Sequence, residues 1–261
     1  MVSNDPLLIA HRGESFDAPE NTLAAVNLAW ERGASAVEVD VHATGDGELA
    51  VIHDRDTLRT TGVRLQVNQA PLSALQQLDA GSWKGIAWKE ERIPSLTQVL
   101  ATVPFHGKLV IEIKSGAGMP EKISRAITET GLRPDQVELL SFDFRKLAAS
   151  KHLMPQHRML WVIESRRQWS QYARDLHTKA VLRRLGTHGV DGIAIGDSRH
   201  MNRRYIRDFI AVGRPVYVWT VNDPDRAAEL LEYGVTGIIS DRAVWMSEML
   251  KNGNQDKPEN T

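Results

Sequence analysis

The 261-residue sequence contains no cysteine, which excludes disulfide bonds, thiolate metal sites and a cysteine nucleophile. It also has almost no excess of charge of either sign. Lys and Arg number 32, Asp and Glu number 33, and the formal net charge is -1. This balance argues against nucleic acid or an anionic membrane as a partner, while leaving room for a small basic pocket.

No apolar run approaches the ~18 residues that would indicate a membrane span. Residues 1–6 are polar and lack the basic-then-apolar layout of a signal peptide. We therefore expect a cytoplasmic protein without stable membrane insertion. The polar residues 252–261 are expected to form a disordered tail. The sequence leaves the oligomeric state open.

What the sequence does contain is an alternation of short apolar runs with amphipathic helical patterns. The runs are rich in Val, Ile and Leu, as expected for strands buried on both faces. They cover residues 7–10, 36–41, 109–113, 137–140, 159–163, 192–195, 216–219 and 236–239. The helical patterns cover residues 21–32, 95–101, 120–130, 144–151, 168–185, 203–212, 223–233 and 242–250. This alternation predicts one (β/α)₈ TIM barrel over residues 1–251, with an open doubly wound sheet as the alternative.

One segment, residues 54–92, contains no clean strand–helix unit. Before it, Asp46-Gly47 forms a favoured two-residue hairpin turn. The hairpin would return through residues 49–52 and present His53. We therefore read residues 54–92 as a small insertion after the second strand.

Ionisable side chains gather where the predicted strands end. In a barrel of this kind, active-site groups project from the carboxyl ends of the strands. Glu38 and Asp40 should share a face, because side chains alternate along a strand. The candidates in chain order are His11, Arg12, Glu38, Asp40, His53, Glu112, Lys114 and, as a pocket wall, Trp219.

These residue types point to phosphodiester chemistry. Three carboxylates at one mouth cannot all stay ionised without a cation, and oxygen ligands favour Mg²⁺ or Ca²⁺. Arg12 and Lys114 suit phosphate oxygens. Two histidines beside them fit general acid–base cleavage, one taking a proton and the other donating one.

Each of these signals also has a structural explanation. A lone histidine near a strand end is usually structural, and a Glu-x-Asp pair usually forms salt bridges. Glu112 and Lys114 could form a surface ion pair, and Asn222 could cap a helix as readily as contact a ligand. The coincidence of all of them at one rim favours the functional reading.

The sequence also resembles the glycerophosphodiester phosphodiesterase family. The matching segments occur in family order from one end of the chain to the other. They are Ile9-Ala10-His11-Arg12-Gly13, Pro19-Glu20-Asn21-Thr22, Glu38-Val39-Asp40-Val41, Thr44-Gly45-Asp46-Gly47, His53-Asp54, Arg59-Thr60-Thr61, Ile93-Pro94-Ser95-Leu96, Glu112-Ile113-Lys114, Trp219-Thr220-Val221-Asn222 and Gly237-Ile238-Ile239-Ser240-Asp241.

The resemblance implies a TIM barrel of the phospholipase C-like phosphodiesterase type with a small insertion. It implies His11 and His53 as the acid–base pair, and one divalent metal, Mg²⁺ or Ca²⁺. The metal ligands would be Glu38, Asp40 and Glu112, with Arg12 and Lys114 on the phosphate. The implied reaction is hydrolysis of a small-molecule glycerophosphodiester to sn-glycerol 3-phosphate and an alcohol.

Two positions depart from the family's commoner pattern. Gln98 stands where Glu is frequent, and His42 follows the carboxylate pair where the family usually has a residue that is not ionisable. We expect His42 to face away from Glu38 and Asp40. Two other functions stay open. One is a lysophospholipase D or other phosphodiesterase, with an acyl chain near Trp83 and Trp88, and the other is a non-catalytic phosphate-binding protein.

Overall fold

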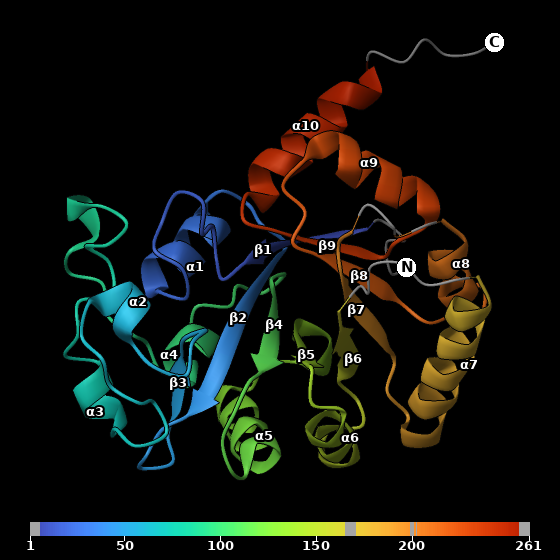
Figure 1. The fold of residues 1–261 in the computed structure, drawn as a ribbon. Helices are drawn as coiled ribbons and strands as arrows, with labels where there is room; N and C mark the ends of the chain where they lie inside the picture. Colours follow the sequence, from blue (N-terminus) through green and yellow to red (C-terminus); the bar gives the residue numbers. More distant parts are fainter. Residues whose placement is uncertain (1–5, 165–170, 199–200, 202, 256–261) are drawn as a thin grey trace.

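The computed structural model describes residues 6–164, 171–198, 201 and 203–255, and the predicted closed barrel is confirmed (Figure 1). Its parallel strands are β1 (Leu7–His11), β2 (Ala36–Ala43), β4 (Lys108–Ile113), β5 (Val137–Ser141), β6 (Arg158–Ile163), β7 (Gly192–Gly196), β8 (Val216–Trp219) and β9 (Gly237–Ser240). The sheet order is β1-β9-β8-β7-β6-β5-β4-β2, and pairing of β1 with β2 closes the ring. The alternative of an open doubly wound sheet is therefore wrong.

Helices cover the outside of the barrel. They are α1 (Leu23–Glu31), α4 (Leu96–Leu100), α5 (Met119–Thr130), α6 (Phe144–Leu153), α7 (Gln171–His188), α8 (Arg203–Ile210), α9 (Pro224–Tyr233) and α10 (Ala243–Gln255). α10 extends to Gln255, so the chain is still helical where we expected the tail to begin at residue 252. Residues 168–170 of one predicted helix, and 256–261 of the tail, lie outside the described residues.

The strands are buried on both faces, which explains their nearly continuous apolar runs. One apolar cluster fills the barrel interior and includes Ala36, Val110, Leu140 and Tyr217. A larger cluster packs the outer face of the strands against the helices. Because side chains alternate, Ala36 and Val110 share the inner face with the ionisable residues two and four positions further along β2 and β4. The inner faces of β2 and β4 are thus apolar inside the barrel and ionisable towards their carboxyl ends.

The predicted hairpin and insertion form a layer beside the barrel. β3 (Leu49–Val51) pairs antiparallel with β2. The segment that follows contains α2 (Leu58–Thr61), α3 (Leu72–Leu75) and a 3₁₀ turn, η1 (Ile86–Trp88). A second 3₁₀ turn, η2 (Pro134–Gln136), lies elsewhere in the chain, immediately before β5. The hairpin and the insertion share a separate apolar cluster, which includes Ile52, Val67, Leu75 and Ile93. In the described part of the chain, no helix is both long enough and apolar enough to cross a membrane.

Candidate active site

The structure brings three carboxylates together at the mouth of the barrel. Glu38, Asp40 and Glu112 each offer an oxygen, and these oxygens all lie within 4.8 Å of one another. Register pairing of Asp40 with Glu112 across β2 and β4 places them side by side. Glu38 and Asp40 are 2% and 1% exposed. Such a set of carboxylate oxygens could hold a divalent cation.

Two cations lie among these carboxylates. Lys114 Nζ is 2.9 Å from Asp40 Oδ1 and 2.7 Å from Glu112 Oε1. Arg12 Nε is 3.1 Å from Asp40 Oδ2, and its backbone N–H donates to Glu38 Oε2 at 3.0 Å. All five members of the predicted cluster therefore meet at one place.

The pKa values of two neighbouring carboxyl groups in the cluster are shifted in opposite directions. Burial, with the charges of Asp40 and Glu112, raises the pKa of Glu38 well above its usual range. Burial alone would also raise the pKa of Asp40, but Lys114 and Arg12 lower it below the usual range. Without a further positive charge, Glu38 therefore tends to hold a proton. The residues present thus fit a divalent cation, which would replace that proton.

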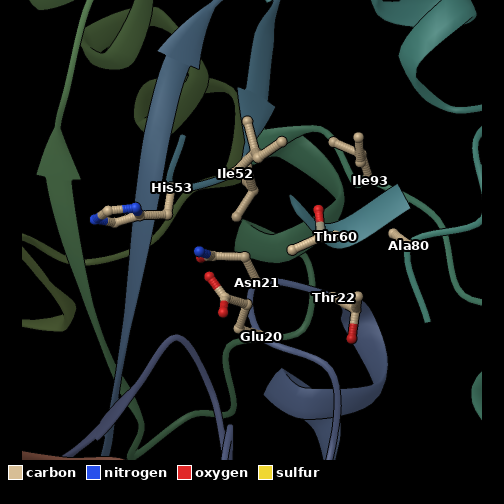
Figure 2. Close-up of a pocket in the computed structure, with 9 residues that line it drawn as sticks. Glu20, Asn21, Thr22, Ile52, His53, Thr60, Ala80 and Ile93 are labelled. Atoms are coloured by element: carbon tan, nitrogen blue, oxygen red, sulfur yellow. The ribbon is translucent and has the colours of Figure 1, made fainter. Parts of the chain in front are cut away.

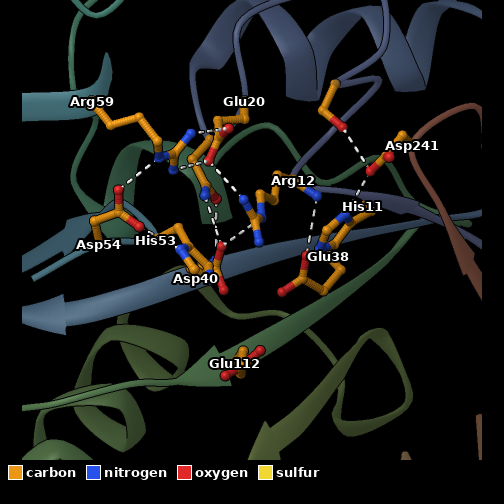
Figure 3. A network of polar contacts seen from close by, with 12 residues as sticks. His11, Arg12, Glu20, Glu38, Asp40, His53, Asp54, Arg59, Glu112 and Asp241 are labelled. Carbon is orange, nitrogen blue, oxygen red and sulfur yellow. Dashed lines mark hydrogen bonds and ion pairs between the residues drawn. The ribbon is translucent and has the colours of Figure 1, made fainter. Parts of the chain in front are cut away.

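His11 is hydrogen-bonded to a carboxylate that lies near the other end of the sequence. Its Nδ1 donates to Asp241 Oδ1 at 2.6 Å, across 230 residues of sequence (Figure 3). Asp241 also accepts from Asn222 Nδ2 at 2.7 Å. Burial would raise the pKa of Asp241, but the hydrogen bond and charge of His11 lower it to about 2. An ionised carboxylate only accepts hydrogen bonds, so the proton is on Nδ1 and Nε2 is the nitrogen free for chemistry.

His53 is held in the same manner from the other side of the mouth. Its Nδ1 donates to Asp54 Oδ1 at 2.7 Å, and Arg59 Nε donates to Asp54 Oδ2 at 2.7 Å. Arg59 continues to Glu20, which also accepts from Arg12 at 2.8 Å (Figure 3). Burial lowers the pKa of His53, which favours its neutral form. Two histidines thus flank the carboxylate cluster, each with Nδ1 on a carboxylate.

The loop from β1 to α1 supplies several of these contacts. Asn21 has φ 60°, and its side chain donates to Asp40 Oδ2 at 2.9 Å and accepts from Asp40 N–H at 3.1 Å. It lines a small pocket with Glu20, His53 and Thr60, between this loop and the hairpin (Figure 2). Strained backbone next to a charged cluster is common at functional sites.

Sequence reasoning missed the roles of Asn21, Glu20, Asp54, Arg59 and Asp241. All five stand in segments that carry the family resemblance. The signal available in the sequence was that each of them is a polar residue inside a family-matching segment and has no other assigned role. Asn222 belongs to this set as well, because it contacts Asp241 while Asp223 caps α9.

Trp219 lies at the mouth, at the end of β8. Its ring packs edge-on against Phe142 with centroids 5.6 Å apart. Its buried Nε1 has no hydrogen-bond partner among the residues that the structure describes. Such a donor suits a polar group of a ligand, so the position of Trp219 fits the predicted pocket wall.

Gly13 fixes the path of the chain immediately after His11 and Arg12. It has φ +81°, and a Cβ there would lie 2.4 Å from the carbonyl carbon of Ala25. We expect Gly13→Ala to lower the free energy of unfolding by about 2–5 kcal/mol, from backbone strain plus the clash. Urea unfolding measures this change. Gly33→Ala is the matched control, because Gly33 has φ +86° with no atom within 4 Å.

Gly33→Ala should cost only the left-handed backbone penalty, about 1–2 kcal/mol. Equal losses of stability in the two variants would contradict the close approach of Gly13 to Ala25.

The fold and the site define a (β/α)₈-barrel hydrolase with an acidic cluster and two histidines at its mouth. The glycerophosphoryl diester phosphodiesterase family model matches residues 11–244, and the chain belongs to this family. The resemblance inferred from the sequence is confirmed. The protein is therefore a glycerophosphodiester phosphodiesterase, a phosphoric diester hydrolase.

Individual relatives support the assignment over nearly the whole chain. A glycerophosphodiester phosphodiesterase of Caldanaerobacter subterraneus subsp. tengcongensis is 32% identical over 253 residues, covering 95% of this chain and 98% of the relative. One from Bacillus subtilis is 30% identical over 257 residues, covering 92% and 85%. The structure of an Oleispira antarctica phosphodiesterase in complex with the product sn-glycerol-3-phosphate is 31% identical, with TM-score 0.81, covering 94% and 97%.

Proposed function

We propose that this enzyme hydrolyses glycerophosphodiesters to sn-glycerol 3-phosphate and an alcohol, with one divalent metal and two-histidine acid–base catalysis. The observation that carries the proposal is the pair of histidines, each bonded through Nδ1 to a carboxylate, on two sides of one carboxylate cluster. The product seen with the Oleispira antarctica relative supports the same substrate class.

In this proposal Glu38, Asp40 and Glu112 hold Mg²⁺ or Ca²⁺. The metal would supply positive charge to the phosphoryl oxygens. Arg12 and Lys114 would contact the phosphate as well. Both now pair with carboxylates, but an arginine has five N–H donors and a lysine three, so each keeps donors for phosphate oxygens.

His11 and His53 would transfer the protons. One Nε2 takes a proton from the attacking hydroxyl, and the other gives a proton to the oxygen of the leaving alcohol. The pair can serve either water or the neighbouring glycerol hydroxyl as nucleophile. In both cases Asp241 and Asp54 keep the Nε2 atoms available and stabilise each ring when it is protonated.

Product release from a set of diesters tests the proposed function. We expect purified, chelator-stripped protein to release sn-glycerol 3-phosphate from glycerophosphocholine once Mg²⁺ or Ca²⁺ is added. An activity matrix of metals against head groups would identify both preferences. Binding of the diesters without any product, under every divalent metal tried, would instead indicate a phosphate-binding protein.

Asp241→Asn tests the positioning of His11. We expect kcat to fall about 10²-fold, less than on loss of His11 itself, because the amide cannot stabilise a protonated ring. Steady-state kinetics on glycerophosphocholine measures it. Asp223→Asn is the control, since Asp223 caps α9 and asparagine caps equally well. Equal activity of the two variants would show that Asp241 has no part in positioning His11.

A second candidate substrate class is lysophospholipids, favoured by apolar side chains at the mouth. Phe16, Trp83 and Ile86 are 52%, 43% and 80% exposed. Phe16 N–H donates to Asp241 O at 3.0 Å, which places Phe16 beside the His11 carboxylate. Lys84 Nζ donates to a backbone carbonyl oxygen in the loop that contains Phe16, at 2.7 Å. This bond places residues 83–86 beside that loop. An acyl chain could lie against such a surface.

A Phe16→Ser, Ile86→Ser double variant tests this class. It should lower kcat/KM for lysophosphatidylcholine about tenfold or more, the effect of losing about 1.4 kcal/mol of apolar contact, and leave glycerophosphocholine unchanged. Phe105→Ser is the control, because Phe105 is 71% exposed and precedes β4 at the opposite end of the barrel. No lysophosphatidylcholine hydrolysis by the unaltered enzyme would exclude this class.

A further inference from the structure

His42 does not face away from the carboxylates, and that expectation from the sequence was wrong. Residues 38, 40 and 42 are two apart, so they share one strand face. The side chain of His42 is 3% exposed, and both ring nitrogens are engaged. Its Nε2 lies 2.9 Å from the carbonyl oxygen of His53, and its Nδ1 lies 2.7 Å from Ser115 Oγ.

These contacts fix the tautomer of the neutral ring. A carbonyl oxygen only accepts hydrogen bonds, so Nε2 of His42 carries the hydrogen and donates to His53. Nδ1 then accepts from the Ser115 hydroxyl. The ring therefore links the end of β2 to His53, the proposed acid–base residue, and to Ser115, which follows Lys114.

The backbone around His53 explains why a side chain is needed there. β3 pairs with β2 at residues 41–43, and Ile52 N–H still donates to Asp40 O at 3.0 Å. Further back along β2, the same edge pairs with β1 at residues 36–38. The hairpin must therefore leave β2 at His53, whose carbonyl loses a strand partner. The Nε2–H of His42 provides the replacement.

We propose that His42 is a positioning residue, whose Nε2–H holds the backbone of His53 and thereby sets the place of the His53 ring at the carboxylate cluster. The proposal rests on the proposed function, in which His53 transfers a proton. The hydrogen bonds of His42 reach neither the proposed phosphate contacts nor the proposed metal ligands, so it acts through His53.

Three substitutions separate the hydrogen bond from simple packing. His42→Leu fills the space without a donor, and we expect kcat to fall about 10- to 100-fold, as for other residues that orient an active-site group. KM and metal affinity should stay within about twofold. His42→Gln should recover most of the loss, because its amide N–H can reach the His53 carbonyl. Ser115→Ala leaves the Nε2–H bond in place and should lower kcat much less than His42→Leu.

A double-mutant cycle with His53→Ala tests whether His42 acts through His53. In the His53→Ala background, His42→Leu should cause no further loss of kcat, because there is no ring left to position. Equal fold losses in the two backgrounds, or a folded His42→Gln no more active than His42→Leu, would overturn the positioning role. Full activity of His53→Ala alone would instead overturn the proposed function, so the two failures are distinguishable.

Discussion

Replacing His11 or His53 by alanine is expected to lower kcat by about 10²–10⁴-fold, the usual range for loss of a general acid or base. Each imidazole has one nitrogen on an ionised carboxylate and the other free for proton transfer. Without either ring, the proton must go to or come from water. Release of glycerol 3-phosphate from glycerophosphocholine, followed at saturating substrate, measures the loss.

The two alanine variants should still bind the metal, because neither histidine is among the three carboxylates proposed to hold it. Calorimetric titration with Mg²⁺ or Ca²⁺ is the control for an intact site. The double variant should be little worse than either single one, since the proposed base and acid act together in the same reaction. Near-full turnover by either single variant would refute the acid–base assignment.

Removal of the divalent metal should reduce hydrolysis by more than about 10³-fold, because the charge it would supply is several kcal/mol of transition-state stabilisation. The affinity for the metal should also rise with pH. Burial and neighbouring charges raise the pKa values of Glu38 and Glu112, so these carboxyl groups keep their protons to higher pH than exposed carboxyl groups do, and metal binding must displace those protons. Low pH therefore favours the protonated, metal-free site, and raising the pH favours the metal complex.

For one displaced proton, the apparent Kd should fall up to about tenfold per pH unit until Glu38 is ionised in the free protein. Titrations in two buffers of different ionisation enthalpy would count the protons released. Glu38→Gln, which has no proton to lose at that position, should bind more weakly and with a shallower pH dependence. A Kd that is constant between pH 5 and pH 8 would contradict a protonated Glu38 in the metal-free site.

Strand periodicity made the barrel and its cluster predictable. The apolar runs of β2 and β4 end in Glu38, Asp40 and Glu112, and the barrel rule then places these ends at one mouth. The hairpin turn at Gly47 likewise predicted the return of His53. These inferences needed only local sequence and one general rule about strand ends.

Contacts made by loops could not be predicted in the same way. Asp241 follows β9 and reaches His11 only because β1 pairs with β9 in the closed ring. Asn21 reaches Asp40 from a backbone conformation with positive φ, which sequence alone did not indicate. The error over His42 was of another kind, because strand alternation already placed it on the face of Glu38 and Asp40.

The hydrogen bond between His11 and Asp241 joins the first strand of the barrel to the last one. During synthesis His11 leaves the ribosome long before its carboxylate partner exists. A nascent chain that has assembled most of its strands still has an unoriented imidazole at this position. The proposed proton transfer by His11 therefore requires that β9 has paired with β1. A measurement of catalytic turnover would consequently be a stricter test of a completed barrel than a measurement of helix content.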